Sequence, residues 1–577
     1  MKDRLELAAI GAIAGGCLWA VFEHLPDRLG NGFLVLAVTV GAAVFFSVLM
    51  ALVGPERPVR ALWPSLTLGA LTGGLALWSG LRFESVSGFY EAGHPLLALG
   101  VVTLVGTPFA AATLEDQAGW RRYARLFDSA WAIFIRYVAG WLFAGLILVV
   151  LLLSDALLKL VGVTVIEAWL DIVWLRSMLI GAVFGLGVAT VHELRDYVSP
   201  VLVHRLLRMV LPLVLVVVIV FLGALPFRGL SDLFGSFSTA GVLMAVAFAG
   251  VTLITAAIDR DDETASHLPL MIVAARLMAL LIPVLVALAI YAIWLRVAAY
   301  GWTPGRVGAA YIALFLTGYS GFYLWAVVRR GGWQARLRQS NLRMALAVWA
   351  GAVLWLTPLF QAEAIATSSQ LARFEAGRLE ASAVPVYELA QEWGRAGTAG
   401  LAAIEAVAEA PLRARIAEAR AAQSVWAFER KDMDEQNRAL RQDLRESLRV
   451  VSQGQAGEAL LAGMDARVLA QIARECPLRA APSCALIVTE GQGNRDLGGL
   501  GLLVTQEGND VFVIRQSGSR MSLAGSAARG ATGGSDLVSR PPGLFEAVMA
   551  GAYSLETQRY EALRIGDVIF FPYNLPH

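Results

Sequence analysis

The sequence predicts an α-helical polytopic membrane bundle of about eleven transmembrane helices, followed by a soluble α+β C-terminal domain. Composition is the first reason: hydrophobic residues make up 57% of the chain and charged residues only 16%, whereas soluble domains carry about 25% charged residues. Distribution is the second, because long apolar runs follow one another up to about residue 360 and none follows it. We therefore expect a transmembrane helical domain over residues 1–360 and a polar remainder outside the bilayer.

The expected spans come from the length of each apolar run. A helix that crosses a bilayer needs roughly 20 consecutive apolar residues. No cleavage site for a signal peptide follows the first run, so this run is expected to remain as a span. Eleven segments meet the length requirement, at residues 5–23, 33–53, 62–81, 95–113, 130–153, 172–192, 203–225, 237–258, 268–295, 307–328 and 342–360.

A segment between the fourth and fifth spans combines arginine with aromatic residues. Residues 115–127 hold Trp120, Arg121, Arg122 and Arg125. This mixture is typical of a helix that lies on an anionic membrane surface. An ordinary charged loop explains it equally well.

The distribution of positive charge predicts the orientation of the chain. Lys and Arg concentrate on the cytoplasmic side of membrane proteins. With eleven spans, the side that holds the N-terminus carries 16 of these residues near the spans, and the other side carries 7. We expect a cytoplasmic N-terminus and, because the number of spans is odd, a C-terminal domain in the periplasm of a bacterium.

Two cysteines agree with that placement. Cys476 and Cys484 flank a turn-like stretch at residues 477–483, and they are close enough in the sequence to close a short disulfide loop. Disulfides persist in oxidising compartments. A pair of free, buried thiols is the alternative.

The polar remainder is expected to contain two parts. Apolar residues at helical spacing predict a helical juxtamembrane region over residues 361–455. Short β-rich runs bounded by turns predict a small α+β domain over residues 456–577. The stretch 518–534, rich in glycine and serine, is expected to be a mobile loop. The expected strands are 484–489, 500–505, 510–516 and 567–572.

Ionisable residues inside the spans are the first candidates for a binding site, because a charge in the bilayer is costly. Arg136 lies in the fifth span and Arg276 in the ninth. Arg276 would suit an anionic substrate or a lipid headgroup, and pairing with a carboxylate or with carbonyls inside the bundle is the structural alternative. No carboxylate clearly occupies a bilayer midplane, which counts against a proton- or sodium-coupled carrier.

Catalytic and metal-binding motifs are missing from the sequence. The six histidines show no ligand spacing, and neither a nucleophile elbow nor a Walker motif occurs. We therefore expect no metal and no cofactor. An enzyme would have to use His192 with Glu193, or Glu167 with Asp171. The acidic run 259–263 is expected to be a solvated loop.

Two short motifs flank the last two spans. Residues 300–306 (YGWTPGR) open the tenth span, and residues 368–373 (SSQLAR) follow the eleventh. A YG-x-T-x-x-R turn together with an SQ-x-x-R element resembles the bacterial family called domain of unknown function 4153 (DUF4153), over residues 130–400. The resemblance implies a bacterial inner-membrane protein and carries no established reaction. Tyr300, Trp302 and Arg306 suit a turn at the membrane surface and are candidate binding residues.

Three functions remain open at this point. A non-enzymatic envelope scaffold, assembly factor or sensor is favoured, since catalytic motifs are missing beside a sizeable C-terminal domain that would bind envelope proteins. A transporter or lipid-handling protein would need a cavity near Arg276. A membrane enzyme on lipid-linked substrates would need clustered carboxylates under a lateral opening. The net charge is +5 up to residue 360 and −4 beyond it, so neither part is basic enough to suggest nucleic acid as a partner. Membrane lipids are expected partners.

Overall fold

The computed structural model describes residues 2–53, 58–193, 200–228, 239–329, 331–452, 466–476, 482–489, 500–506, 511–517, 520–526, 544–552, 563–565 and 568–570. The chain separates into two compact units, residues 1–420 and 421–577. Each unit has its own hydrophobic core.

The first unit is helical, as its long apolar runs predict. Three single turns interrupt the helices: η1 (Gly119–Arg121), η3 (Ala381–Ala383) and the π turn η4 (Glu388–Glu392). The helices are α1 (Lys2–Leu29), α2 (Gly32–Leu52), α3 (Pro58–Gly80), α4 (Val86–Ala92), α5 (His94–Glu115), α6 (Tyr123–Leu160), α7 (Val165–Asp171), α8 (Val173–Glu193), α9 (Pro200–Arg228), α10 (Thr239–Ile258), α11 (Pro269–Tyr300), α12 (Pro304–Val328), α13 (Trp333–Leu356), α14 (Ala362–Glu375), α15 (Gly394–Val407) and α16 (Ala410–Ala421).

Nine helices in the described part of the chain are long and apolar enough to cross a membrane. They are α1, α2, α5, α6, α8, α9, α10, α11 and α12. The two other expected spans coincide with α3 and α13, which are helices of 23 and 24 residues but are less apolar. The long apolar helices indicate a multi-pass membrane protein.

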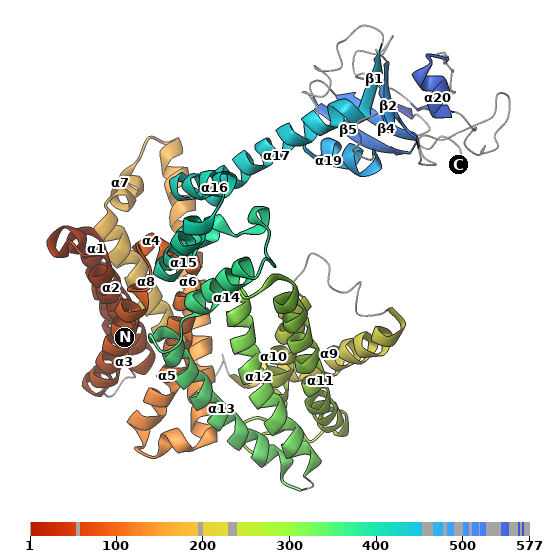
Figure 1. The fold of residues 1–577 in the computed structure, drawn as a ribbon. Coiled ribbons are helices and arrows are strands. Elements are labelled where there is room, and N and C mark those ends of the chain that lie inside the picture. Colours follow the sequence, from red (N-terminus) through yellow and green to blue (C-terminus); the bar gives the residue numbers. More distant parts are fainter. Residues whose placement is uncertain are drawn as a thin grey trace. The chain divides into compact units, whose positions relative to one another are not determined.

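The long helices form two groups that α5 and α13 connect (Figure 1). One group contains α1, α2, α3, α6 and α8, and the other contains α9 to α12. The core of the second group is made almost wholly of aliphatic side chains, such as Ile254, Met278 and Ile282, which are all fully buried. This dense packing is what apolar helices of a bundle achieve when few polar side chains face inward.

Glycine brings α1 and α8 into backbone contact. A Cβ atom at Gly11 would lie 2.0 Å from the carbonyl oxygen of Gly181, and one at Gly185 would lie 2.1 Å from that of Leu7. Larger residues at these positions would push the helices apart. Small residues at this spacing are typical of packed transmembrane helices.

The ends of the helices gather into two sets. The first set, which we call the α14 end, comprises residues 81–94, 298–303 and 357–375. Arg82 donates to the carbonyl oxygen of Trp355 at 2.8 Å, and Gln370 donates to that of Trp302 at 2.9 Å. Segments that precede α5, follow α11 and follow α13 therefore meet at one end of the unit.

The second set, which we call the Asp259 end, comprises residues 123–128, 204–208, 256–266 and 333–341. Arg260 lies 3.1 Å from Asp128, and Arg338 lies 2.6 Å from Asp262. Segments at the start of α6 and α13 thus meet the segment after α10. Consecutive long helices that alternate between two ends give the bundle its up-and-down connectivity.

The helical segment after α13 belongs to the first unit. α14 packs against α12 and α15, and residues up to 420 remain part of the same compact unit. The boundary between the units therefore lies at residue 420, within the region 361–455 that the sequence predicts to be helical.

The second unit contains a five-stranded sheet in the order β1-β2-β3-β4-β5, in which β1 and β2 are parallel and the other pairs are antiparallel. A separate hairpin pairs β6 with β7. The elements are α17 (Val425–Ser447), β1 (Leu448–Ser452), α19 (Ala466–Glu475), β2 (Cys484–Thr489), β3 (Leu500–Thr505), β4 (Val511–Ser517), β5 (Arg520–Ser526), α20 (Leu544–Met549), β6 (Leu563–Ile565) and β7 (Val568–Phe570).

Alternation along β2 places helices on both faces of this sheet. Leu486 packs with Leu469 and Ile472 of α19, whereas its neighbour Ile487 packs with Phe545 of α20. Successive side chains of a strand point to opposite faces, so β2 is buried on both sides. This double burial explains its continuous apolar sequence.

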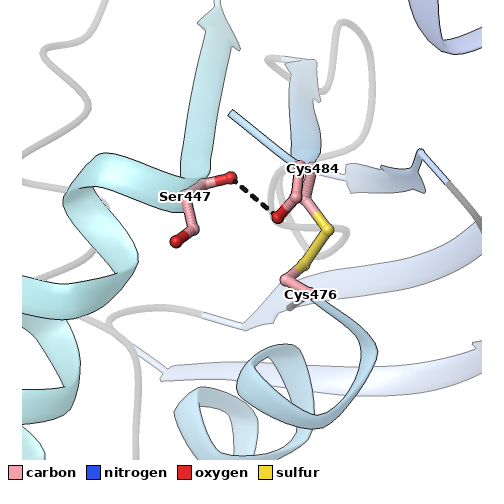
Figure 2. Close-up of a disulfide and its surroundings, with 4 residues drawn as sticks. Ser447, Cys476 and Cys484 are labelled. Atoms are coloured by element: carbon pink, nitrogen blue, oxygen red, sulfur yellow. Dashed lines mark hydrogen bonds between the residues drawn. A yellow bond between two sulfur atoms is a disulfide. The ribbon is translucent and has the colours of Figure 1, made fainter. Parts of the chain in front are cut away.

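A disulfide joins Cys476, just after α19, to Cys484, the first residue of β2 (Figure 2). The two Cα atoms are 5.7 Å apart. Both cysteines are fully buried. The bridge ties α19 to β2, an inner strand of the sheet.

One prediction for this unit is wrong. The stretch 518–534 was expected to be a loop throughout, but residues 520–526 form β5, which pairs with β4. Pairing along the edge of β4 provides backbone hydrogen bonds that a glycine- and serine-rich composition does not reveal.

Candidate functional site

The turn between α11 and α12 is built from the residues of the first motif. α11 ends at Tyr300, and Gly301 has a φ of +75°, a conformation that glycine adopts at little cost. The hydroxyl of Thr303 accepts a hydrogen bond from the backbone N–H of Arg306, which caps α12. Pro304 occupies the first helical turn, where its missing N–H is not needed.

Helix α14 supplies the hydrogen-bond donors that the end of α11 lacks. The last four carbonyls of a helix have no partner within it. Arg373 donates to the carbonyl oxygens of Ala298 and Ala299 at 3.3 and 2.7 Å. Gln370 donates to those of Tyr300 and Trp302 at 3.0 and 2.9 Å. The two motifs that the sequence singles out therefore bind each other.

The contact between α14 and the turn is close and directional. The hydroxyl of Ser369 accepts a hydrogen bond from the backbone N–H of Trp302 at 3.1 Å. A Cβ atom at Gly301 would lie 2.7 Å from Cδ of Arg373 and 2.9 Å from Nε2 of Gln370. Glycine is therefore required at position 301 both for its backbone conformation and for the space that α14 occupies.

The candidate binding residues of this turn have structural partners. Arg306 donates to the carbonyl oxygen of Gly301 at 2.6 Å, and its guanidinium lies 5.6 Å from the ring centre of Tyr300. The guanidinium of Arg296 lies 6.0 Å from the same ring centre. Tyr300 is 58% exposed, and Trp302 is partly buried against the core of α5 and α13. Tyr300 is thus the most accessible residue of the turn.

A second cluster lies at the start of α14, and spacing in the sequence gives no sign of it. His94, at the start of α5, approaches Glu363 with Nε2 3.1 Å from Oε1. Nε1 of Trp355 donates to Nδ1 of His94 at 3.1 Å. Because an indole nitrogen only donates, Nδ1 accepts and the imidazole proton lies on Nε2, toward Glu363. The side chain of Glu363 is only 3% exposed.

The charge state of Glu363 follows from its neighbours. Burial by itself raises the pKa of this carboxyl, but the interaction with His94 and the positive charge of Arg82 outweigh it and hold the pKa below the ordinary value of 4.5. Glu363 is therefore ionised at neutral pH. Arg82 itself donates to the carbonyl oxygens of Trp355 and Thr357.

Helix α15 closes the same cluster from outside. The backbone N–H of Arg395 donates to the carbonyl oxygen of Arg82 at 2.9 Å. A Cβ atom at Gly400 would lie 2.1 Å from Cγ2 of Thr367, so α14 and α15 pack without space for a larger residue. The cluster of Arg82, His94, Trp355 and Glu363 thus comes from α5, α13, α14 and the segment after α3, and α15 packs against α14 and this segment.

The two arginines predicted as candidates within the spans are not brought together with this site. Arg136 donates to the carbonyl oxygen of Ala51 at 3.1 Å and so satisfies the end of α2. Arg276 is exposed, and its guanidinium lies 5.1 Å from the ring centre of Trp333, at the start of α13. Each arginine thus makes a contact within the fold, and the two do not belong to one site.

The other candidate residues are also apart from this site. Glu167 pairs with Lys159, which also contacts Asp155, each at 2.9 Å. Asp171 is exposed at the end of α7. The side chains of His192 and Glu193 lie outside the described residues. No group of three or more histidine, cysteine or acidic residues suited to a metal ion occurs in the described ranges.

One expectation for the Asp259 end is wrong, and one of the two alternatives for residues 115–127 is excluded. The run 259–263 is not simply solvated, because Asp259 is only 7% exposed and its carboxylate binds the guanidinium of Arg208. Residues 115–127 do not form one surface helix: α5 ends at Glu115, a short turn follows, and α6 begins at Tyr123. Charge-rich composition alone does not distinguish these arrangements.

The carbonyls that end α10 accept hydrogen bonds from arginine side chains, as those that end α11 do. Arg208 donates to the carbonyl oxygen of Ala256 at 2.8 Å. Arg338 donates to those of Ile258 and Asp259 at 2.6 and 3.1 Å, and to a carboxylate oxygen of Asp262 at 2.6 Å. Asp259 has a φ of +52°, a conformation that Asp tolerates better than most residues.

The sequence matches the family described as Domain of unknown function (DUF4153) over residues 9–389. The match begins near the start of α1, well before the region 130–400 that the motifs suggest, and it includes the whole of α14. No curated protein and no solved structure matches the chain. Since the match covers more than half of the chain and both halves of the α14 contact, the chain belongs to the DUF4153 family.

Proposed function

We propose that this DUF4153 protein is a non-enzymatic scaffold, assembly factor or sensor of the bacterial inner membrane, whose C-terminal unit binds envelope proteins. The observation that carries the proposal is that the polar residues of the second motif bind the protein's own backbone. The side chains of Ser369, Gln370 and Arg373 form hydrogen bonds with backbone groups of the α11–α12 turn and the end of α11. Such contacts fix a shape, whereas a reaction would need polar groups that face a substrate.

The arrangement of the helix ends supports eleven crossings, with α3 and α13 as the two less apolar ones. At 1.5 Å per residue, helices of this length extend about 34–36 Å, which exceeds the roughly 30 Å of a hydrocarbon core. If α3 did not cross, Arg82 would lie at the Asp259 end, yet it contacts residues at the end of α13 and just after it. Eleven crossings place the N-terminus and the C-terminal unit on opposite sides.

The sidedness follows from charge and from the disulfide. The arginines of the Asp259 end, including Arg208, Arg260 and Arg338, match the excess of positive charge expected in the cytoplasm. The Cys476–Cys484 bridge suits an oxidising periplasm. We therefore propose a cytoplasmic N-terminus and a periplasmic C-terminal unit that is a small α+β domain.

Fusions with alkaline phosphatase test the sidedness. The enzyme is active only where its own disulfides form. A fusion after His577 is expected to be active, and one after Gly332, in the turn between α12 and α13, inactive. The opposite pattern would refute the proposed orientation.

Site-specific photocrosslinking in native membranes tests the scaffold hypothesis. Trp426 is 73% exposed, whereas Phe428, two residues later in α17, is 7% exposed. A photoreactive amino acid at position 426 is expected to give discrete protein adducts, and the same amino acid at position 428 should give few. Adducts in equal amount at both positions would reflect non-specific capture.

An enzymatic role would appear in a different experiment. The His94–Glu363 pair is the described cluster that most resembles a catalytic dyad, because a carboxylate there orients a histidine. A turnover of lipid-linked substrate that is lost in Glu363→Gln, while the protein remains folded, would contradict the scaffold hypothesis. We expect no such turnover.

A further inference from the structure

A shallow apolar groove lies on the outside of the first unit, at the end of α5 that leads toward α6. It has a volume of about 430 Å³ and is lined by Pro64, Phe109, Ala110, Thr113, Leu114 and Trp120. Five of these six residues come from α3 and α5, and Trp120 comes from η1. The lining offers an acyl chain a surface with few polar groups.

The position of the groove along the helices places it at a membrane interface. α5 is long and apolar enough to cross a membrane, and the groove lies against its last two turns. Trp63, one residue before Pro64, is 73% exposed. Tryptophan is enriched at the level of the lipid headgroups, so Trp120 in the lining and Trp63 beside Pro64 mark that level.

The turn that carries Trp120 is held rigidly. Asp116 accepts a hydrogen bond from the backbone N–H of Ala118 at 3.1 Å. Gly119 packs so closely on α5 that a Cβ atom there would lie 2.1 Å from the carbonyl oxygen of Ala112. The groove is therefore formed before any ligand arrives, which lowers the entropic cost of binding.

Charge at the mouth of the groove selects the headgroup. The guanidinium of Arg121 lies 4.7 Å from the ring centre of Trp120, and its side chain is exposed. Arg122 is paired with Asp116 at 3.2 Å, and Arg125 is paired with Glu115 at 3.0 Å. Within the described ranges, no carboxylate pairs with Arg121, which leaves its charge available to an anion.

We propose that this groove is a binding site for an anionic phospholipid, with an acyl chain against Phe109 and Trp120 and the phosphate at Arg121. An arginine offers a phosphate two parallel hydrogen bonds. A zwitterionic lipid would find the same apolar lining but would gain less from the charge. The site therefore differs from the general lipid contact of a transmembrane surface by its preference for a negative headgroup.

Native mass spectrometry of the full chain in mild detergent tests the proposal. The protein is titrated with phosphatidylglycerol and, separately, with phosphatidylcholine that carries the same acyl chains. The unmodified protein is expected to bind the first phosphatidylglycerol about fivefold more tightly than phosphatidylcholine, the factor expected for one arginine at a membrane surface. Equal affinity for the two lipids would overturn the proposal.

Two pairs of variants locate the effect. Arg121→Gln should reduce phosphatidylglycerol binding about fivefold, whereas Arg122→Gln, whose arginine is already paired with Asp116, should change it little. Thr113→Trp fills the groove and should weaken the binding of both lipids, whereas Thr67→Trp, at an exposed position of α3 outside the groove, should not. Equal losses in both members of either pair would refute the assigned site. Thermal unfolding of each variant confirms that the protein remains folded.

Discussion

At both ends of the first unit, side chains bind the carbonyls that end a helix, but the charges around these contacts differ. At the α14 end, side chains of α14 bind the carbonyls that end α11; at the Asp259 end, Arg208 and Arg338 bind those that end α10. A helix that ends inside a protein needs such donors, because its last carbonyls have no intrahelical partner. Arginine suits the task, since one guanidinium presents several donors.

The difference lies in the counter-charges. At the Asp259 end, two carboxylates accompany the two arginines: Asp259 binds Arg208, and Asp262 binds Arg338. At the contact between α14 and the α11–α12 turn, the partners of Gln370 and Arg373 are neutral carbonyls. The pair of Arg208 and Asp259 is largely buried, whereas Asp262 is exposed. Removal of one partner of a buried ion pair is strongly destabilising, because the other partner is left charged and buried. The Asp259 end should therefore be the more sensitive of the two to single substitutions.

Removal of Arg338 is the severest test of this comparison. Arg338→Met keeps an apolar side chain of similar length but leaves Asp262 and two backbone carbonyls without their donor. Because three charge-assisted hydrogen bonds are lost, we expect the free energy of unfolding to fall by about 3–5 kcal/mol, measured by thermal unfolding in detergent. Arg343→Met, at an exposed position of the same helix, serves as the control and should change it by less than about 0.5 kcal/mol. Similar losses in the two variants would mean that the Asp259 end is not held by Arg338.

Removal of Gln370 tests the α14 end. Gln370→Ala leaves the carbonyls of Tyr300 and Trp302 without a donor, and we expect a loss of about 2 kcal/mol. The control is Ser368→Ala, because the exposed hydroxyl of Ser368 bonds only within α14. A loss for Gln370→Ala as large as that for Arg338→Met would remove the contrast between the neutral and the ionic contacts.

Acid should remove the stability that Glu363 contributes but should leave that of the Gln370 and Arg373 contacts unchanged. The folded protein holds the pKa of Glu363 below 4.5, so the stability that this carboxylate contributes is fully present above that value and is lost as the pH falls through the lowered pKa. Glu363→Gln removes the charge and should cost about 1 kcal/mol at pH 7. The difference in unfolding temperature between the unmodified protein and this variant should shrink toward zero below pH 4. A difference that is constant from pH 7 to pH 3 would show that folding does not lower the pKa of Glu363.

The contacts with Gln370 and Arg373 involve no group that titrates in the same range. Gln370→Ala should therefore lower the unfolding temperature by a similar amount at pH 7 and at pH 4. This pairing separates the two halves of α14: the first turn depends on a charge, whereas the later turns depend on hydrogen bonds to the backbone.

Much of this architecture can be predicted from the sequence, because a helix depends mainly on the residues within its own segment. Apolar runs of sufficient length predict helices wherever they occur, and each of the eleven expected spans coincides with one. The sequence also singles out residues 300–306 and 368–373. It does not show that Gln370 and Arg373 bind the end of α11, because that contact depends on how α14 folds back over the turn.

The His94–Glu363 pair and the burial of Asp259 depend on long-range packing. His94 and Glu363 belong to helices far apart in the chain, and no spacing rule connects them. Asp259 begins an acidic run that composition assigns to solvent, yet Arg208 from α9 makes its burial favourable. Charge can be read from a sequence, but the partner that makes a buried charge tolerable cannot.

An arginine that stacks on a ring provides the smallest and most discriminating test. Arg276 lies close to the Asp259 end in the fold, since Trp333 begins the helix that carries Arg338, but it contacts the ring of Trp333 and is exposed. A cation–π contact at an exposed site contributes about 0.5–1 kcal/mol, so Arg276→Gln should lower the free energy of unfolding by no more than that. Arg276→Lys should restore part of the loss, because an ammonium also interacts with an aromatic ring. A loss comparable to that for Arg338→Met would show that Arg276 takes part in the ionic network, and the ranking of the arginines by their partners would then fail.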